Sequence, residues 1–146
     1  MSKDLENFKE MISLIPAMRQ AVRTGLERDM EDHVHDIDRI HIELKFLKQS
    51  FILFRKKWTY DIIYVIRHLK TPYFNEIKKV LPKINSRSLT DRLRLLEKKG
   101  LVNRKVHNSQ PYRVSYELTD FGRGAYELLL PLLYYFVLPE KYRKLK

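Results

Sequence analysis

Apolar residues recur with a helical period from residue 37 to residue 58. They follow one another at steps of three and four: Ile37, Ile40, Leu44, Leu47, Phe51, Phe54 and Trp58. This spacing is the a/d seam of a coiled coil or of a helix in a bundle. Residues 26–70 contain no proline or glycine. The pattern therefore predicts a long helix with one apolar seam within that range.

A seam of this kind needs a cover, because a helix with a single apolar face is marginal when alone in water. The cover is either the chain's own domain or a second copy of the chain. We expect a second copy. For the part after Phe51, packing within one chain is nearly as well supported.

The residues before the seam also have a helical pattern. A first amphipathic helix has its apolar face at Leu5, Phe8, Ile12 and Ile15. We expect Pro16 to stop or restart this helix, because a proline is well tolerated only in a first helical turn. Gly25 is expected to interrupt the helix that follows.

Two further helices are predicted between residues 58 and 82. The first ends before Thr71 and Pro72, and its inward residues are Trp58, Ile62, Ile63, Ile66 and Leu69. The second is shorter and is closed by Pro82. Its apolar residues are Phe74, Ile77, Val80 and Leu81.

The stretch from Lys83 to Lys105 combines a helix, a stop signal and a basic strand. Asn85 is a suitable N-cap and Gly100 a suitable residue just past the helix end. The face expected to be buried carries Leu89, Leu93 and Leu96, and the opposite face carries Arg87, Asp91, Arg94 and Lys98. A short, capped, basic helix of this kind fits the major groove of DNA.

A hairpin and a last helix follow. Residues 101–107 and 113–118 read as two strands joined by a turn rich in Asn, Ser and Pro. Thr119 is expected to cap the last helix, with Asp120 in its first turn. That helix is apolar on most sides, so we expect another subunit to cover it.

Charge is distributed unevenly along the chain. The net charge is +11 and the pI is about 9.8. Residues 55–116 hold sixteen Lys/Arg and four Asp/Glu, whereas residues 24–43 hold two Lys/Arg and seven Asp/Glu. A basic excess confined to one segment favours a nucleic-acid surface over general solubility, although a merely solvated basic face is the plainer alternative.

Several classes of function lack support in the sequence. The absence of cysteine excludes disulfides, thiolate metal sites and thiol redox chemistry. No nucleophile motif or phosphate-binding loop is present, so we expect no enzyme activity and no cofactor. Asp29, His33 and Asp36 would share a helical face, yet their spacing matches no standard zinc motif, and we expect no metal. No sorting signal or spanning segment is found, which predicts an intracellular, soluble protein with no membrane partner.

Taken together, residues 57–122 resemble the HxlR-type winged helix-turn-helix regulators, relatives of the MarR group. The resemblance rests on Lys57-Trp58, Phe74-Asn75-Glu76-Ile77, Leu81-Pro82 with Ile84, Leu89-Thr90 with Arg92-Leu93, Leu96-Glu97 with Gly100-Leu101-Val102 and Arg104, Val114 with Tyr116 and Leu118-Thr119, and Gly122. Each motif is common alone. Their order and spacing together are specific.

The resemblance implies a homodimer that binds an operator through paired recognition helices and wings. The implied recognition-helix contacts are Ser86, Arg87, Ser88, Thr90, Asp91, Arg92 and Arg94. Those of the wing and its flanks are Asn75, Arg104, Lys105, His107 and Arg113. Arg87 and Arg94 suit guanine O6/N7, and Arg113 suits the minor groove. The expected dimerisation residues are Ile37, Ile40, Leu44, Leu47, Phe51, Phe54, Leu129, Leu133 and Phe136.

The chain also departs from the family pattern. The usual cysteine ahead of the Lys-Trp pair is absent, so oxidant sensing through that thiol cannot operate. Lys83 stands where a glycine is common, and Tyr112 replaces the second proline of the usual wing turn. The acidic, heptad-bearing segment before Phe51 is longer than the family's usual N-terminal arm.

The sequence thus predicts a mainly α (α+β) protein in three parts. Residues 1–54 and 119–146 are expected to be helical and to dimerise, and residues 55–118 to form the winged helix-turn-helix domain. The expected function is sequence-specific regulation of transcription on double-stranded DNA, in the cytoplasm and associated with the nucleoid, with an unknown small-molecule effector as a further partner. The alternatives are an architectural chromatin protein and a module that binds another protein through the seam.

Overall fold

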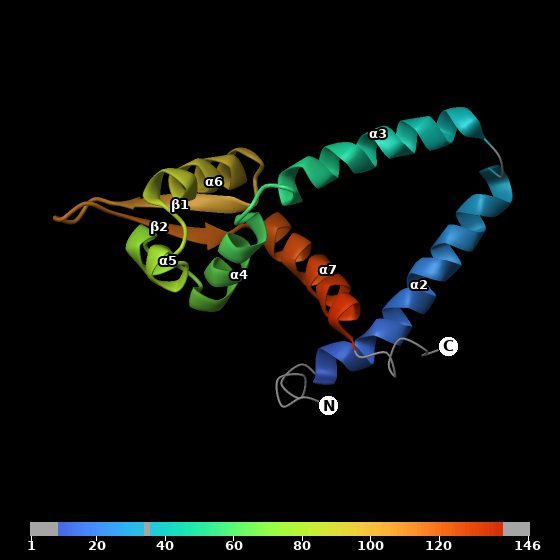
Figure 1. Cartoon of the computed structure of the whole chain (residues 1–146), viewed down its shortest axis with the longest axis horizontal. Coiled ribbons are helices and arrows are strands. Elements are labelled where there is room, and N and C mark those ends of the chain that lie inside the picture. Colours follow the sequence, from blue (N-terminus) through green and yellow to red (C-terminus); the bar gives the residue numbers. More distant parts are fainter. Residues whose placement is uncertain (1–8, 34–35, 139–146) are drawn as a thin grey trace. The chain divides into compact units, whose positions relative to one another are not determined.

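The computed structural model describes residues 9–33 and 36–138. Along the chain it contains helices α2 (Lys9–His33), α3 (Ile37–Phe54), α4 (Thr59–Leu69), α5 (Phe74–Val80) and α6 (Ser86–Lys98), strands β1 (Val102–His107) and β2 (Arg113–Leu118), and helix α7 (Asp120–Val137). Figure 1 shows these elements in sequence colours. The predicted class, mainly helical with a two-stranded hairpin, is confirmed.

The chain divides into two compact units. One comprises Met1–Leu44 with Leu128–Lys146, and the other is Lys45–Glu127. The boundaries between them fall inside α3 and α7, whereas the sequence placed domain boundaries after residues 54 and 118.

The core of the Lys45–Glu127 unit is built from α4, α5, α6 and the hairpin. Its most deeply buried apolar side chains are Ile62, Ile63, Ile66, Ile77, Ile84, Leu89, Leu93, Leu96, Leu101 and Val102. Strands β1 and β2 pair antiparallel, from Val102 opposite Leu118 to His107 opposite Arg113. The three helices lie beside this hairpin, whose tip extends past them (Figure 1). This is the arrangement of a winged helix.

The segment between α4 and α5 pairs briefly with β2, at the edge of the sheet. The backbone N–H of Tyr116 donates to the carbonyl of Pro72 over 2.9 Å. Tyr73 forms an isolated antiparallel bridge with Ser115. The start of α5 is therefore tied directly to the second strand of the hairpin.

The other unit joins α2 to the C-terminal half of α7. Ile12, Ile15 and Leu138 are buried together, and Tyr135 packs against them. The prediction that Pro16 stops the helix is wrong, because α2 runs through it without a break. Pro16 and Gly25 are both exposed, and the buried apolar residues of α2, Ile12 and Ile15, lie before Pro16.

The long helix predicted from the seam is shorter than expected, since the chain leaves the helical conformation before Ile37 and again between Phe54 and Thr59. The side chain of Asp36 accepts a hydrogen bond of 3.0 Å from the backbone N–H of Arg39, and so caps a new helix, α3. Trp58, the residue just before α4, has φ +73°, a non-helical conformation that separates α4 from α3. Leu69, expected inside, is 45% exposed at the end of α4.

Within residues 9–33 and 36–138, no helix is long and apolar enough to cross a membrane.

Candidate nucleic-acid interface

Helix α6 has well-defined ends that the local sequence explains. The Asn85 side chain accepts a hydrogen bond of 2.7 Å from the backbone N–H of Ser88. At the other end Gly100 has φ +73°. The N–H of Leu101 donates to the carbonyl of Leu96, and that of Gly100 to Glu97. These two bonds form a Schellman motif, so the predicted caps are confirmed.

The two faces of α6 differ in chemistry. Leu89, Leu93 and Leu96 are buried in the core of the unit. The side chains on the opposite face are exposed: Arg87, Asp91, Arg94 and Lys98. The leucines therefore fix the rotation of the helix about its axis and present two arginines outward.

The other predicted recognition residues are, with one exception, less exposed to solvent. Ser86 is exposed, whereas Ser88, Thr90 and Arg92 are half-buried. The Thr90 hydroxyl donates to the backbone carbonyl of Ser86 over 2.9 Å. Its hydrogen atom is thus already used within the helix.

Helix α5 is tied to the turn that leads to α6. Its first turn is closed by Glu76, whose carboxylate accepts from the backbone N–H of Tyr73 over 2.7 Å. The Lys78 ammonium donates to the carbonyl of Ile84, in the turn that leads to α6. The predicted flanking residue Asn75 is exposed on α5.

On the wing, Arg104 and Arg113 are exposed, but Lys105 has a partner. The Lys105 ammonium lies 2.8 Å from the Glu117 carboxylate. This hydrogen bond lowers the pKa of Glu117 below its ordinary value. Part of the predicted positive charge of the wing is therefore neutralised within the hairpin.

His107 lies in the last residue pair of the hairpin before its turn, and its side chain is half-buried. Its Nε2 is 2.8 Å from the Ser115 hydroxyl, and its ring meets the Tyr73 ring edge-on at 5.6 Å. The Arg113 guanidinium lies 5.5 Å from the centre of the same tyrosine ring. The contacts link the wing to the start of α5.

Two of these residues, Tyr73 and Glu117, were not singled out from the sequence. Glu117 stands opposite Asn103 in the hairpin register, and Lys105 is two residues further along the same strand. Since residues two apart on a strand share a face, the opposite charges of Lys105 and Glu117 were a usable signal. Tyr73 carried no such signal, because its role depends on the tertiary path of the chain.

The residues predicted to dimerise are mostly exposed. On α3 these are Ile37, Ile40, Leu44, Leu47 and Phe51, while Phe54 is half-buried. On α7, Phe136 is exposed but Leu129 and Leu133 are half-buried. The exposed apolar stripe of α7 instead joins Phe136 to Leu128 and Leu132.

Of the three residues weighed as a metal site, Asp29 lies in α2 and Asp36 precedes α3, and the side chain of His33 lies outside those that the structure describes. Helix α2 ends at His33, and Asp36 caps α3. Asp29 pairs with Arg39, which also lies 2.7 Å from Glu43. Hydrogen bonds to these carboxylates raise the pKa of Arg39 above its ordinary value. No group of three or more metal-ligating side chains occurs in the described part of the chain.

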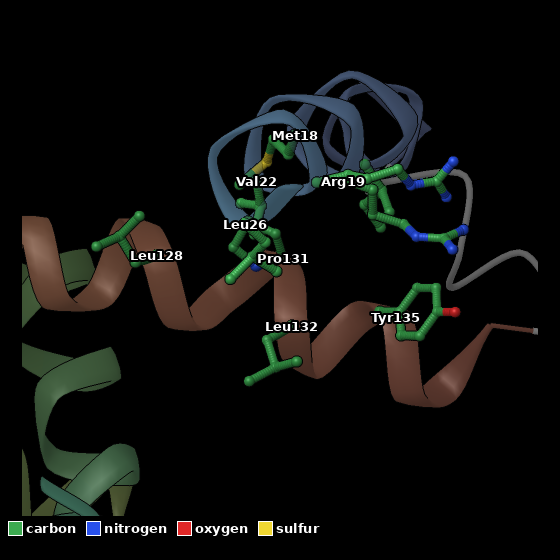
Figure 2. A pocket seen from close by; sticks show the side chains of 10 residues that line it. Met18, Arg19, Val22, Leu26, Leu128, Pro131, Leu132 and Tyr135 are labelled. Atoms are coloured by element: carbon green, nitrogen blue, oxygen red, sulfur yellow. The ribbon is translucent and has the colours of Figure 1, made fainter. Parts of the chain in front are cut away.

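An apolar cleft of about 460 Å³ lies between α2 and α7 in the unit that contains both. Figure 2 shows Val22 and Leu26 of α2 facing Pro131 of α7. Arg19 and Arg23 add positive charge to its lining. The Arg19 guanidinium lies 5.6 Å from the centre of the Tyr135 ring.

Comparison with known proteins places this geometry in a family. The family model described as HxlR-like helix-turn-helix matches residues 53–137. The chain is 46% identical over 57 residues to YdeP of Bacillus subtilis, an uncharacterized HTH-type transcriptional regulator. These aligned residues make up 39% of this chain and 44% of YdeP. It is 38% identical over 73 residues to YtcD of the same organism, covering 50% of this chain and 57% of YtcD. The chain spans about half the length of these curated relatives.

Solved structures agree with this placement. The reduced form of the transcriptional regulator YodB from B. subtilis superimposes with a TM-score of 0.56 and 30% identity, over 60% of this chain and 85% of YodB. A regulator of the MarR family from Enterococcus faecalis V583 gives a TM-score of 0.58 and 33% identity, over 63% and 83% of the two chains. With the family model covering more than half of its length, the chain belongs to the HxlR-like helix-turn-helix family.

Proposed function

We propose that this protein is a transcriptional regulator of the helix-turn-helix type that binds double-stranded DNA as a homodimer. The observation that carries the proposal is the outward face of α6, where Arg87 and Arg94 are exposed opposite three buried leucines. The curated relatives YdeP and YtcD, both HTH-type transcriptional regulators, support it.

In the proposed complex α6 enters the major groove. Arg87 and Arg94 each present a planar group that can donate two hydrogen bonds to guanine O6 and N7. Asp91 accepts from cytosine N4 or orients Arg87 four residues away. Ser86 and the exposed Asn75 of α5 contact phosphates, which fix the position of the protein without reading bases.

The wing contributes through Arg104 and Arg113, which are exposed on its two strands. Arg113 enters the adjacent minor groove, where a narrow groove attracts arginine. His107 acts indirectly in this proposal, because its contacts to Ser115 and Tyr73 hold the wing against α5.

A selection of bound sequences from random DNA duplexes tests the proposal. We expect a defined, two-fold symmetric motif, whose half-site spacing reports the distance between the two recognition helices. A flat sequence profile would instead support an architectural protein that binds DNA through its backbone alone.

The homodimer has its own test. We propose that the exposed α3 residues pack against a second copy. Replacing Leu44 and Leu47 with Asp places unpaired charge in that contact and is expected to weaken dimerisation. Light scattering measures the mass of the variant. An unchanged mass would exclude α3 and favour the exposed stripe of α7.

A small-molecule effector is also proposed, with the cleft between α2 and α7 as the space it occupies. Its volume lies within the usual range of ligand pockets, and its lining is mainly apolar. The sequence contains no cysteine, so the proposed effector does not act through a cysteine thiol. One of the similar solved structures is the redox regulator HypR in its oxidized form, but a chain without cysteine does not sense oxidants through a cysteine thiol.

A further inference from the structure

Helix α3 has an apolar seam with nothing packed on it in the part of the chain that the structure describes. Ile37, Ile40, Leu44, Leu47 and Phe51 are between 42% and 69% exposed, and no residue of α3 is buried. All five precede residue 53, where the match to the family model begins. The seam is therefore a feature of this chain rather than of the matched family segment.

The heptad positions follow from the seam. With Ile37, Leu44 and Phe51 at a and Ile40 and Leu47 at d, the flanking g positions are Asp36, Glu43 and Ser50. The flanking e positions within the helix are His41 and Lys48. One flank of the seam is thus acidic or neutral, and the other is basic or titratable.

This charge pattern discriminates between the two possible orientations of a helix pair. In a parallel pair in register, each g residue faces the e residue five positions later on the other helix. Glu43 then faces Lys48, and Asp36 faces His41. In an antiparallel pair, g positions face g positions and e positions face e positions, which brings like charges together. The pattern favours the parallel pair.

We infer that α3 forms a parallel, in-register coiled coil with α3 of a second copy, oriented by Glu43–Lys48 pairs on both sides of the seam. The inference rests on the proposed homodimer and adds its orientation. Glu43 is 54% exposed even though it pairs with Arg39, so it has room for a second cationic partner.

The short length of α3 limits how strongly this contact alone can hold two copies together. Its 18 residues span roughly 27 Å at about 1.5 Å per residue. Helices this short associate weakly by themselves. The coiled coil therefore sets the orientation of the two copies, while other surfaces add to their affinity.

Disulfide cross-linking of the full chain tests the orientation, because the sequence has no cysteine of its own. The variants are Ile40→Cys, at a d position, and Phe51→Cys, at an a position, made singly and also mixed in equal amounts. A parallel pair in register places a opposite a and d opposite d, close enough for a disulfide, so each single variant is expected to form a cross-linked dimer on mild oxidation. Gln49→Cys, at the outward f position, is the control and should stay unlinked.

A reciprocal charge exchange gives a second, independent measurement. In a parallel pair, Glu43→Lys and Lys48→Glu each produce like-charged contacts with themselves, whereas a mixture of the two produces opposite charges at every pair. With one variant carrying a tag, the mixed dimer should clearly exceed the half expected from random pairing. A mixed fraction of one half would contradict the pairing of Glu43 with Lys48.

The outcomes separate this inference from the proposed function. In an antiparallel pair each a position faces a d position of the other helix, so cross-linking of Ile40→Cys to Phe51→Cys in the mixture, without cross-linking in either alone, would establish that pair and overturn the inference. A dimeric mass by light scattering without any cross-link would place the interface outside α3 and also overturn it. A monomeric mass for the unmodified chain would overturn the proposed homodimer itself. Same-site cross-links at both Ile40→Cys and Phe51→Cys support the inference.

Discussion

Gly122 lies directly against the backbone carbonyl of Leu101, so closely that a Cβ on the glycine would overlap the carbonyl oxygen. The same carbonyl accepts a hydrogen bond of 3.0 Å from the backbone N–H of Thr119. The Thr119 hydroxyl donates to the carbonyl of Gly100 and accepts from the N–H of Gly122 over 2.9 Å. These bonds fix the start of α7 to the turn that follows α6.

Replacing Gly122 with Ala is expected to destabilise the fold. The added methyl group collides with backbone, which cannot move aside without breaking the Thr119 bonds, and overpacking of this kind costs about 1–3 kcal/mol. Urea denaturation measures the loss. Gly124→Ala is the matched control, because a Cβ there meets nothing within 4 Å. It should stabilise by up to about 1 kcal/mol through helix propensity, and equal effects of the two variants would contradict the contact.

The cap of the recognition helix gives a second prediction. Asn85→Ala removes the acceptor for the Ser88 N–H and is expected to cost about 0.5–2 kcal/mol in unfolding free energy. Asn85→Asp keeps a capping oxygen and should retain most of the stability. Equilibrium unfolding of the three proteins checks this. If Asp and Ala were equally destabilising, the side-chain cap would not be the cause.

The ion pair between Lys105 and Glu117 in the wing gives a third prediction. Glu117→Gln removes a negative charge beside Lys105 and leaves its ammonium available to phosphate. We expect DNA affinity to rise by less than about tenfold, roughly the gain from one additional neutralised phosphate. Fluorescence anisotropy at fixed salt measures it. Glu27→Gln, on α2, removes the same charge outside the interface and should change affinity much less; a similar gain there would point to net charge alone.

The winged helix was largely predictable because its signals are local. The spacing of Leu89, Leu93 and Leu96, with Asn85 before them and Gly100 after them, set both the ends and the buried face of α6. The two hairpin strands were equally clear, since alternating residues flank a turn rich in Asn, Ser and Pro. Each of these signals lies within a few residues of the element that it determines.

The remaining features depend on competing local signals or on tertiary contacts. The break at Asp36 was missed because the unbroken seam suggested one helix, although an Asp three residues before an available N–H is an ordinary cap signal. The break at Trp58 places a bulky residue at positive φ, which sequence rarely predicts. The contact of His107 with Ser115 across the hairpin was not predicted, because it depends on strand register.

The central claim is that the outward face of α6 reads DNA through Arg87 and Arg94. Its most direct test compares Arg87→Ala and Arg94→Ala with Arg28→Ala, an exposed residue of α2 that carries the same charge. Affinities are measured at one salt concentration on the selected operator and on a scrambled duplex. We predict that each α6 variant loses about 1–3 kcal/mol on the operator and much less on the scrambled duplex, whereas Arg28→Ala changes neither. Equal losses on both duplexes, or no loss on the operator, would contradict the claim.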